Sequence, residues 1–200
     1  MKVADPVLFI GVDIGVRRDT SAMAAVYRAE GGFMLWGHKI ITPRKKGEVF
    51  STGPREVNIH KNISDTLLKL CEDRRVAGIW YDPFQFISES QRLTDKGFGR
   101  LLFEVNQQTE MPGFSNTLET CITEGSLFLY PDQEVKNHFL WTTAKETERG
   151  WRIIKRKQTK PIDFVVALGM ALYGASSADG ELYHPSYRED VHSMSMMSLP

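Results

Sequence analysis

The sequence predicts an α/β protein with a central mixed β-sheet flanked by helices. Apolar segments at 7–14, 21–27 and 33–41 are typical of strands, and the Glu-Gly-Gly turn at 30–32 joins the last two as a hairpin. Strands joined this closely form an antiparallel meander. Helical and strand patterns alternate after the meander, which favours parallel strands with helices packed on the sheet. The sequence thus predicts a sheet with an antiparallel part and a parallel part.

The elements after the meander follow from the period of their apolar residues. In the segment that begins at Ile59, apolar residues recur at helical spacing, and the apolar run at 76–81 is typical of a buried strand. Asn116 and Glu119 have the spacing of a helix-starting capping box. The predicted helices are 59–70, 84–96, 114–122, 133–147 and 161–175, and the later strands are 76–81, 101–105, 127–130 and 151–156.

Length and composition indicate a single domain. The 200 residues are 42% hydrophobic, which is enough for one sizeable core. We assign residues 1–176 to this domain and expect 177–200, where the periodic pattern stops, to be a flexible tail. A methionine-rich docking segment is the alternative interpretation of that tail.

Charge and cysteine usage restrict the function classes. The formal net charge is zero, which disfavours a protein that binds nucleic acid tightly through overall positive charge. Cys71 and Cys121 lack metal-ligand spacing, so core packing in a reducing compartment is expected. No apolar run approaches about 18 residues, so no membrane span is predicted. The spacing of His60, His138, His184 and His192 indicates core or surface positions rather than metal ligands.

Three aspartates stand at the ends of predicted elements. Asp13 ends the first strand, Asp82 follows the fourth, and Asp163 lies in the first turn of the last helix. Each alone has a plainer interpretation: a strand end, a turn residue before Pro83, or an acid that favours a helix start. Together they predict a site for two divalent ions, Mg²⁺ or Mn²⁺, because these ions prefer oxygen ligands and support phosphodiester hydrolysis.

Further polar residues are candidates around these acids. Asp19 starts the second strand and is either a supporting acid or a turn residue, and Lys160 precedes the last helix and either holds a phosphate or is simply solvated. A cluster of cations near Trp151 could neutralise DNA phosphates, or could be a solvated strand edge. The cluster consists of Arg149, Arg152, Lys155, Arg156, Lys157 and Lys160.

Several short motifs, in this order, resemble the nuclease domain of the large terminase subunit of tailed bacteriophages. The resemblance covers about residues 7–175. Its motifs are Gly11-Val12-Asp13-Ile14-Gly15, Asp19-Thr20-Ser21-Ala22, Trp80-Tyr81-Asp82-Pro83-Phe84-Gln85, Glu104-Val105-Asn106-Gln107, the segment 118–125, and Lys160-Pro161-Ile162-Asp163.

The resemblance implies a ribonuclease H-like fold and a metal-dependent endonuclease that cuts concatemeric viral DNA during packaging. Asp13, Asp82 and Asp163 match the catalytic acids of that family. The implied partners are double-stranded DNA, a packaging ATPase domain, the portal and the small terminase subunit, in the cytoplasm of the infected host and transiently at the procapsid portal. The Gly-x-x-x-x-Gly-Lys-Ser/Thr phosphate loop of the ATPase does not occur in this sequence, so we expect an isolated nuclease domain.

Three alternatives stay open from the sequence. Another nuclease of the same fold, such as a junction resolvase, would use the same acids. An actin-like or sugar-kinase-like nucleotide fold also opens with Asp-x-Gly on a hairpin, although it usually needs about twice this length. A docking module without catalysis would contact a portal or small terminase subunit through the tail or the basic strand.

Overall fold

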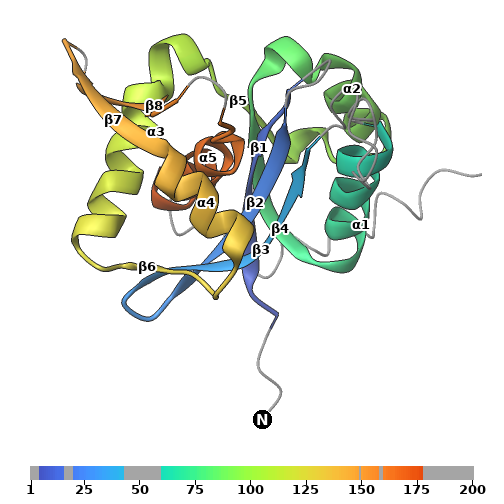
Figure 1. The fold of residues 1–200 in the computed structure, drawn as a ribbon. Coiled ribbons are helices and arrows are strands. Elements are labelled where there is room, and N and C mark those ends of the chain that lie inside the picture. Colours follow the sequence, from blue (N-terminus) through green and yellow to red (C-terminus); the bar gives the residue numbers. More distant parts are fainter. Residues whose placement is uncertain (1–4, 16–19, 43–59, 149, 158–159, 178–200) are drawn as a thin grey trace, which may run out of the picture.

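The computed structural model describes residues 5–15, 20–42, 60–148, 150–157 and 160–177 (Figure 1). A six-stranded sheet with the order β5-β4-β1-β2-β3-β6 forms its centre. Pairing is antiparallel between β1, β2 and β3, and parallel for β1–β4, β4–β5 and β3–β6. The strands are β1 (Val7–Asp13), β2 (Ser21–Ala29), β3 (Gly32–Ile41), β4 (Arg75–Tyr81), β5 (Leu102–Glu104) and β6 (Leu127–Phe128). This confirms the mixed sheet that the sequence predicts.

Helices cover both faces of the sheet, as Figure 1 shows. The helices α3 (Gln107–Thr123), α4 (Gln133–Trp141) and α5 (Asp163–Ser177) lie on one face, and α1 (Asp65–Asp73) and α2 (Ile87–Asp95) lie on the other. Alternate residues of β1 enter the two cores: Phe9 packs on the α5 side, whereas Leu8 and Ile10 pack on the α1 side. Because both faces are buried, β1 is apolar almost throughout.

Short helical turns connect several of these elements. A π-helical turn, His60–Ser64, leads into α1, and two 3₁₀ turns, Pro83–Gln85 and Gly99–Leu101, follow β4 and precede β5. Within the described ranges, no helix has the length and apolar character that a membrane crossing requires. The predicted tail lies almost entirely at 178–200, outside the described residues.

The segment 142–147 corrects the predicted helix 133–147. α4 ends at Trp141, and β7 (Thr142–Thr147) pairs antiparallel with β8 (Gly150–Lys155) in a separate two-stranded sheet. Two adjacent β-branched threonines at the start of β7 favour the extended conformation. The Oγ atom of Ser115 accepts a hydrogen bond from the Ile153 N–H at 3.1 Å, which fixes this hairpin to α3.

The start of α3 corrects the predicted capping box at Asn116 and Glu119. The helix begins at Gln107, where the Asn106 side chain accepts the Gln108 N–H at 2.9 Å, and the Glu110 carboxylate accepts the Asn106 N–H at 2.6 Å. Pro112 lies inside this helix. Proline and the glycine that follows it have low helix propensities, so the sequence does not predict a helix over the first two turns of α3.

Candidate active site

Two of the predicted acids lie at the ends of neighbouring parallel strands. Val12 of β1 is paired in register with Tyr81 of β4, so the next residues, Asp13 at the end of β1 and Asp82 after β4, lie side by side. The carboxyl ends of adjacent parallel strands form one edge of the sheet, where ligands commonly bind. β1 and β4 thus bring two carboxylates to one edge.

The third acid reaches this edge because α5 lies directly against β1. A Cβ atom on Gly11 would stand 1.9 Å from the Ala167 carbonyl oxygen and 2.7 Å from the Ala171 nitrogen. Only glycine allows backbones to approach this closely. Asp163 lies about one helical turn before Ala167, and Asp13 lies two residues after Gly11 on the same face of the strand. The contact therefore directs Asp163 toward Asp13.

The electrostatics of Asp13 reflect these neighbours. Burial first, and then the negative charge of Asp163, raise the pKa of the Asp13 carboxyl to about 7, and Asp82 adds a smaller effect of the same sign. The Gln107 side chain and Lys155 act in the opposite direction. The pKa of Asp13 is thus governed by both other predicted acids, so the three form one electrostatic cluster.

Asp82 also has a structural role. Its Oδ1 atom accepts the Phe84 N–H at 2.9 Å and caps the 3₁₀ turn Pro83–Gln85. The plainer interpretation of Asp82 as a turn residue is therefore correct as far as this oxygen is concerned. A carboxylate has a second oxygen, so capping and ligand binding are compatible in one side chain.

The three acids are not arranged as a preformed metal-binding site in this structure. Among the described residues, no group of three or more His, Cys, Asp or Glu side chains is placed to hold a metal ion as it stands. The Oδ2 atom of Asp163 is buried, and the Asp13 side chain is partly buried. Carboxylate oxygens are nevertheless the donors that Mg²⁺ and Mn²⁺ prefer, so the chemistry of the three side chains fits these ions.

Gln107 ends the motif Glu104-Val105-Asn106-Gln107 named above, but the sequence did not lead us to predict it as a site residue. Its Nε2 atom donates a hydrogen bond to Asp13 Oδ1 at 2.9 Å. Gln107 follows β5, the strand beside β4, and is the first residue of α3. The rule that located Asp13 and Asp82, polar residues after parallel strands, would also have found it.

The remaining predicted site residues lie in different places. Asp19 and Arg149 are outside the described residues. Arg152 and Lys155 belong to β8, and the charge of Lys155 acts on Asp13. The ammonium group of Lys160 lies 4.8 Å from the centroid of the Trp141 ring. With Leu140 and the exposed Arg156 and Lys157, Lys160 and Trp141 line one pocket, which therefore carries three cations.

Comparison with known proteins identifies the fold. No protein-family model and no curated protein sequence matches the chain. The large terminase of bacteriophage HK97 is 18% identical, with a TM-score of 0.71 over 85% of this chain and 40% of that protein. The large terminase nuclease of the thermophilic phage G20c is 14% identical, with a TM-score of 0.64 over 88% of this chain and 85% of that one.

A structure of the G20c nuclease with bound magnesium is also similar, at 15% identity and a TM-score of 0.62 over 85% of this chain and 82% of that one. The chain spans less than half of the HK97 large terminase. These similarities confirm the ribonuclease H-like fold and the predicted resemblance to terminase nuclease domains.

Proposed function

We propose that this chain is a metal-dependent DNA endonuclease domain of a phage packaging terminase. The observation that supports this most is the contact of α5 with Gly11, because it brings Asp163 to the strand ends that present Asp13 and Asp82. Three mutually repelling carboxylates at one edge are costly without a counter-charge, and divalent cations supply one. The fold shared with terminase nucleases is the second line of support.

In this proposal the site binds two ions, each Mg²⁺ or Mn²⁺. Asp13 and Asp82 would share one ion, and Asp163 would hold the other. When bound, such ions activate a water molecule and neutralise charge on the attacked phosphate. Gln107 holds the Asp13 carboxylate through the hydrogen bond at 2.9 Å, which fixes the direction of its second oxygen. Magnesium bound to the G20c nuclease supports this choice of metal.

The proposed substrate is concatemeric double-stranded DNA. Arg152, Lys155, Arg156 and Lys157 would contact its phosphates, with Arg149 and Lys160 as further candidates from the sequence, whereas Asp19 is a candidate supporting acid of the metal site. In a packaging motor the partners would be an ATPase domain, the portal and the small terminase subunit. The chain would then act in the cytoplasm of the infected host and transiently at the procapsid portal.

Plasmid cleavage tests the proposal directly. Purified chain with Mn²⁺ or Mg²⁺ should nick and linearise supercoiled plasmid, and EDTA or Asp13→Ala should prevent this. A strong preference for four-way junctions over linear duplex would instead support a resolvase. If the chain neither cleaves DNA nor binds Mn²⁺, the nuclease proposal fails and a docking module is favoured.

Metal binding should also stabilise the fold. At a Mn²⁺ concentration about 100 times its Kd, the free energy of unfolding should rise by about 2.7 kcal/mol. For a chain of this size, that corresponds to an increase in Tm of roughly 5–10 °C. Differential scanning calorimetry should show this increase for the wild type and for the exposed-site control Asp95→Asn, but not for Asp13→Asn. An equal increase in Tm in all three proteins would show that Mn²⁺ binds at a site that does not include Asp13.

Removing two cations should weaken DNA binding without affecting metal binding. Arg156→Gln with Lys157→Gln should reduce the slope of log Kd against log salt concentration by about 1.8, because each lost phosphate contact contributes about 0.9. Fluorescence anisotropy with a duplex at several salt concentrations measures this slope. Lys96→Gln with Lys69→Gln, two exposed lysines on other elements, is the matched control. An unchanged slope in the test variant would show that Arg156 and Lys157 do not contact DNA phosphates.

A further inference from the structure

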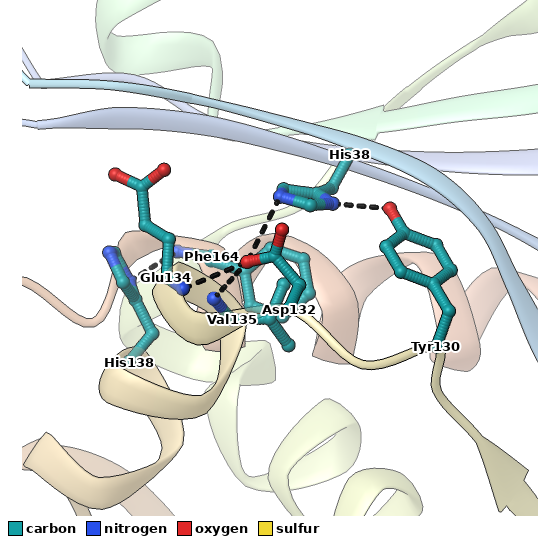
Figure 2. Close-up of polar contacts among 7 residues, drawn as sticks. All are labelled: His38, Tyr130, Asp132, Glu134, Val135, His138 and Phe164. Atoms are coloured by element: carbon teal, nitrogen blue, oxygen red, sulfur yellow. Dashed lines mark hydrogen bonds and ion pairs between the residues drawn. The ribbon is translucent and has the colours of Figure 1, made fainter.

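His138 is a buried polar residue that the proposed chemistry does not use. It lies in α4, is only 1% exposed, and points from that helix toward the start of α5 (Figure 2). A buried histidine normally has hydrogen-bond partners for its ring nitrogens. Its Nδ1 atom accepts the Phe164 N–H at 3.3 Å. His138 thus contacts the residue that directly follows Asp163.

The start of α5 needs this acceptor. The first N–H groups of a helix have no partner inside the helix, and a Ser, Thr, Asp or Asn before the helix usually accepts one of them. Here that position is Ile162, whose side chain has no acceptor. Its carbonyl oxygen accepts the N–H groups of Val165 and Val166 at 2.8 and 3.2 Å. For Phe164, a different helix supplies the cap, through His138.

The protonation state of His138 suits an acceptor. Burial, with a smaller effect from His38, lowers the pKa of His138 to about 4. The ring is therefore neutral at neutral pH. Because Nδ1 accepts the Phe164 N–H, the proton of the neutral ring must be on Nε2.

The surrounding contacts hold both partners of this hydrogen bond. Asp132 caps α4 by accepting the Glu134 and Val135 N–H groups at 2.8 and 2.9 Å, and its Oδ1 lies 3.9 Å from His38 Nε2. Tyr130 contacts the other ring nitrogen of His38 (Figure 2). The fully buried Phe164 ring meets the rings of His38, His138 and Phe139 at steep angles, with centroids 5.4, 6.2 and 6.3 Å away. The start of α5 is therefore held from β3 and α4 together.

We infer that His138 is a positioning residue, which fixes the carboxylate of Asp163 by capping the Phe164 N–H from α4. This inference rests on the proposed role of Asp163. His138 itself touches neither DNA nor an ion in this scheme. A displacement of about 1 Å at a reacting group costs about 10²-fold in rate, so one main-chain hydrogen bond next to a ligand has a large effect.

Two variants of His138 distinguish the effect of its hydrogen bond on Asp163 from the effect of its packing in the core. In His138→Asn the Oδ1 atom can stand where Nδ1 stands and accept the Phe164 N–H. His138→Leu has a similar shape but no acceptor. We expect His138→Asn to retain cleavage within about threefold, and His138→Leu to lose tenfold to about 10²-fold in kcat, with little change in KM for DNA. Mn²⁺ titration by calorimetry should show weaker binding in His138→Leu alone.

Stability alone does not separate the two variants. Leucine favours helices and buried sites more than asparagine does, but it leaves the buried Phe164 N–H without its acceptor, so the two effects oppose each other in the Tm of His138→Leu. The kcat and the Mn²⁺ affinity therefore decide between positioning and packing. Equal kcat and equal Mn²⁺ affinity in the two variants would overturn the inference.

An NMR measurement tests the hydrogen bond whether or not the chain proves to be a nuclease. In the wild type, the ¹⁵N signals of His138 should show an unprotonated Nδ1. The Phe164 amide and the Asp163 carboxyl signals should shift in His138→Leu and stay close to wild type in His138→Asn. If the wild type neither binds Mn²⁺ nor cleaves DNA, the nuclease proposal fails, and these signals still decide whether His138 positions Asp163. Unshifted signals in His138→Leu would overturn the inference.

Discussion

Replacing Asp13 with asparagine is expected to abolish DNA cleavage while the fold remains intact. The amide is neutral, so the cluster loses the carboxylate that faces both Asp82 and Asp163. Charge stabilisation by a bound metal is worth several kcal/mol, and each 1.36 kcal/mol is a factor of ten in rate, so we expect a loss of about 10³-fold or more. Single-turnover plasmid nicking at saturating Mn²⁺ measures the rate, and Asp163→Asn should behave similarly.

The same substitution should stabilise the metal-free protein. The pKa of Asp13 is about 7 in the fold, above its ordinary value of 3.8, so the unfolded chain releases this proton first. Between about pH 4 and pH 7 the folded state binds more protons, and its stability therefore falls as the pH rises. Asparagine does not titrate, so the variant does not lose stability through this group as the pH rises. We expect Asp13→Asn to be more stable than wild type by roughly 1–3 kcal/mol at pH 8 after solvent screening, and equal to it at pH 4.

Urea unfolding at the two pH values, in EDTA, measures this difference. Asp95→Asn is the control, because Asp95 is exposed at the end of α2 and is not among the groups that shift the pKa of Asp13. A variant that lost both activity and stability at pH 8 would contradict the view of Asp13 as a strained ligand. Loss of activity with gain of stability is typical of a functional site.

Gly11→Ala should have the largest effect on stability. The added Cβ would stand 1.9 Å from the Ala167 carbonyl oxygen, a main-chain atom that cannot rotate away. α5 would have to move from the sheet, and its buried residues would lose their packing. We expect a loss of about 3 kcal/mol or more, which corresponds to a decrease in Tm of roughly 6–12 °C.

Gly37→Ala is the matched control for this substitution. Gly37 lies in β3 of the same sheet, and no atom lies within 4 Å of the place where its Cβ would stand. Thermal unfolding of both variants compares a blocked position with an open one. If Gly11→Ala had a Tm close to that of Gly37→Ala, the contact between β1 and α5 could not be what positions Asp163.

The sequence was sufficient for those parts of the site that depend on local patterns. The buried strand before Asp13, the strand before Asp82 and the apolar helix that begins at Asp163 each have a period of their own. The meander and the alternation that follows it were sufficient to predict a sheet with an antiparallel and a parallel part, but not the order of its strands. Local patterns therefore predicted both the elements and the ends at which the acids stand.

Contacts between distant elements could not be predicted in this way. His138 caps α5 from a helix 26 residues away, and no periodicity marks that pairing. β7 formed where a helix was predicted, because pairing with β8 provides hydrogen bonds that propensity does not count. The start of α3 at Gln107 was not predicted either, because Pro112 and Gly113 lie within its first two turns. These errors occur where tertiary contacts decide the local conformation.

The narrow contact between β1 and α5 also bears on how such a domain can diverge in evolution. The space there is limited by main-chain atoms, so position 11 tolerates only glycine, whereas the apolar positions around it accept any side chains of suitable total volume. The core can therefore keep its arrangement while most of its apolar side chains change. The fold similarity to the HK97 large terminase, with a TM-score of 0.71 at only 18% identity, is compatible with this division between fixed main-chain contacts and exchangeable side chains.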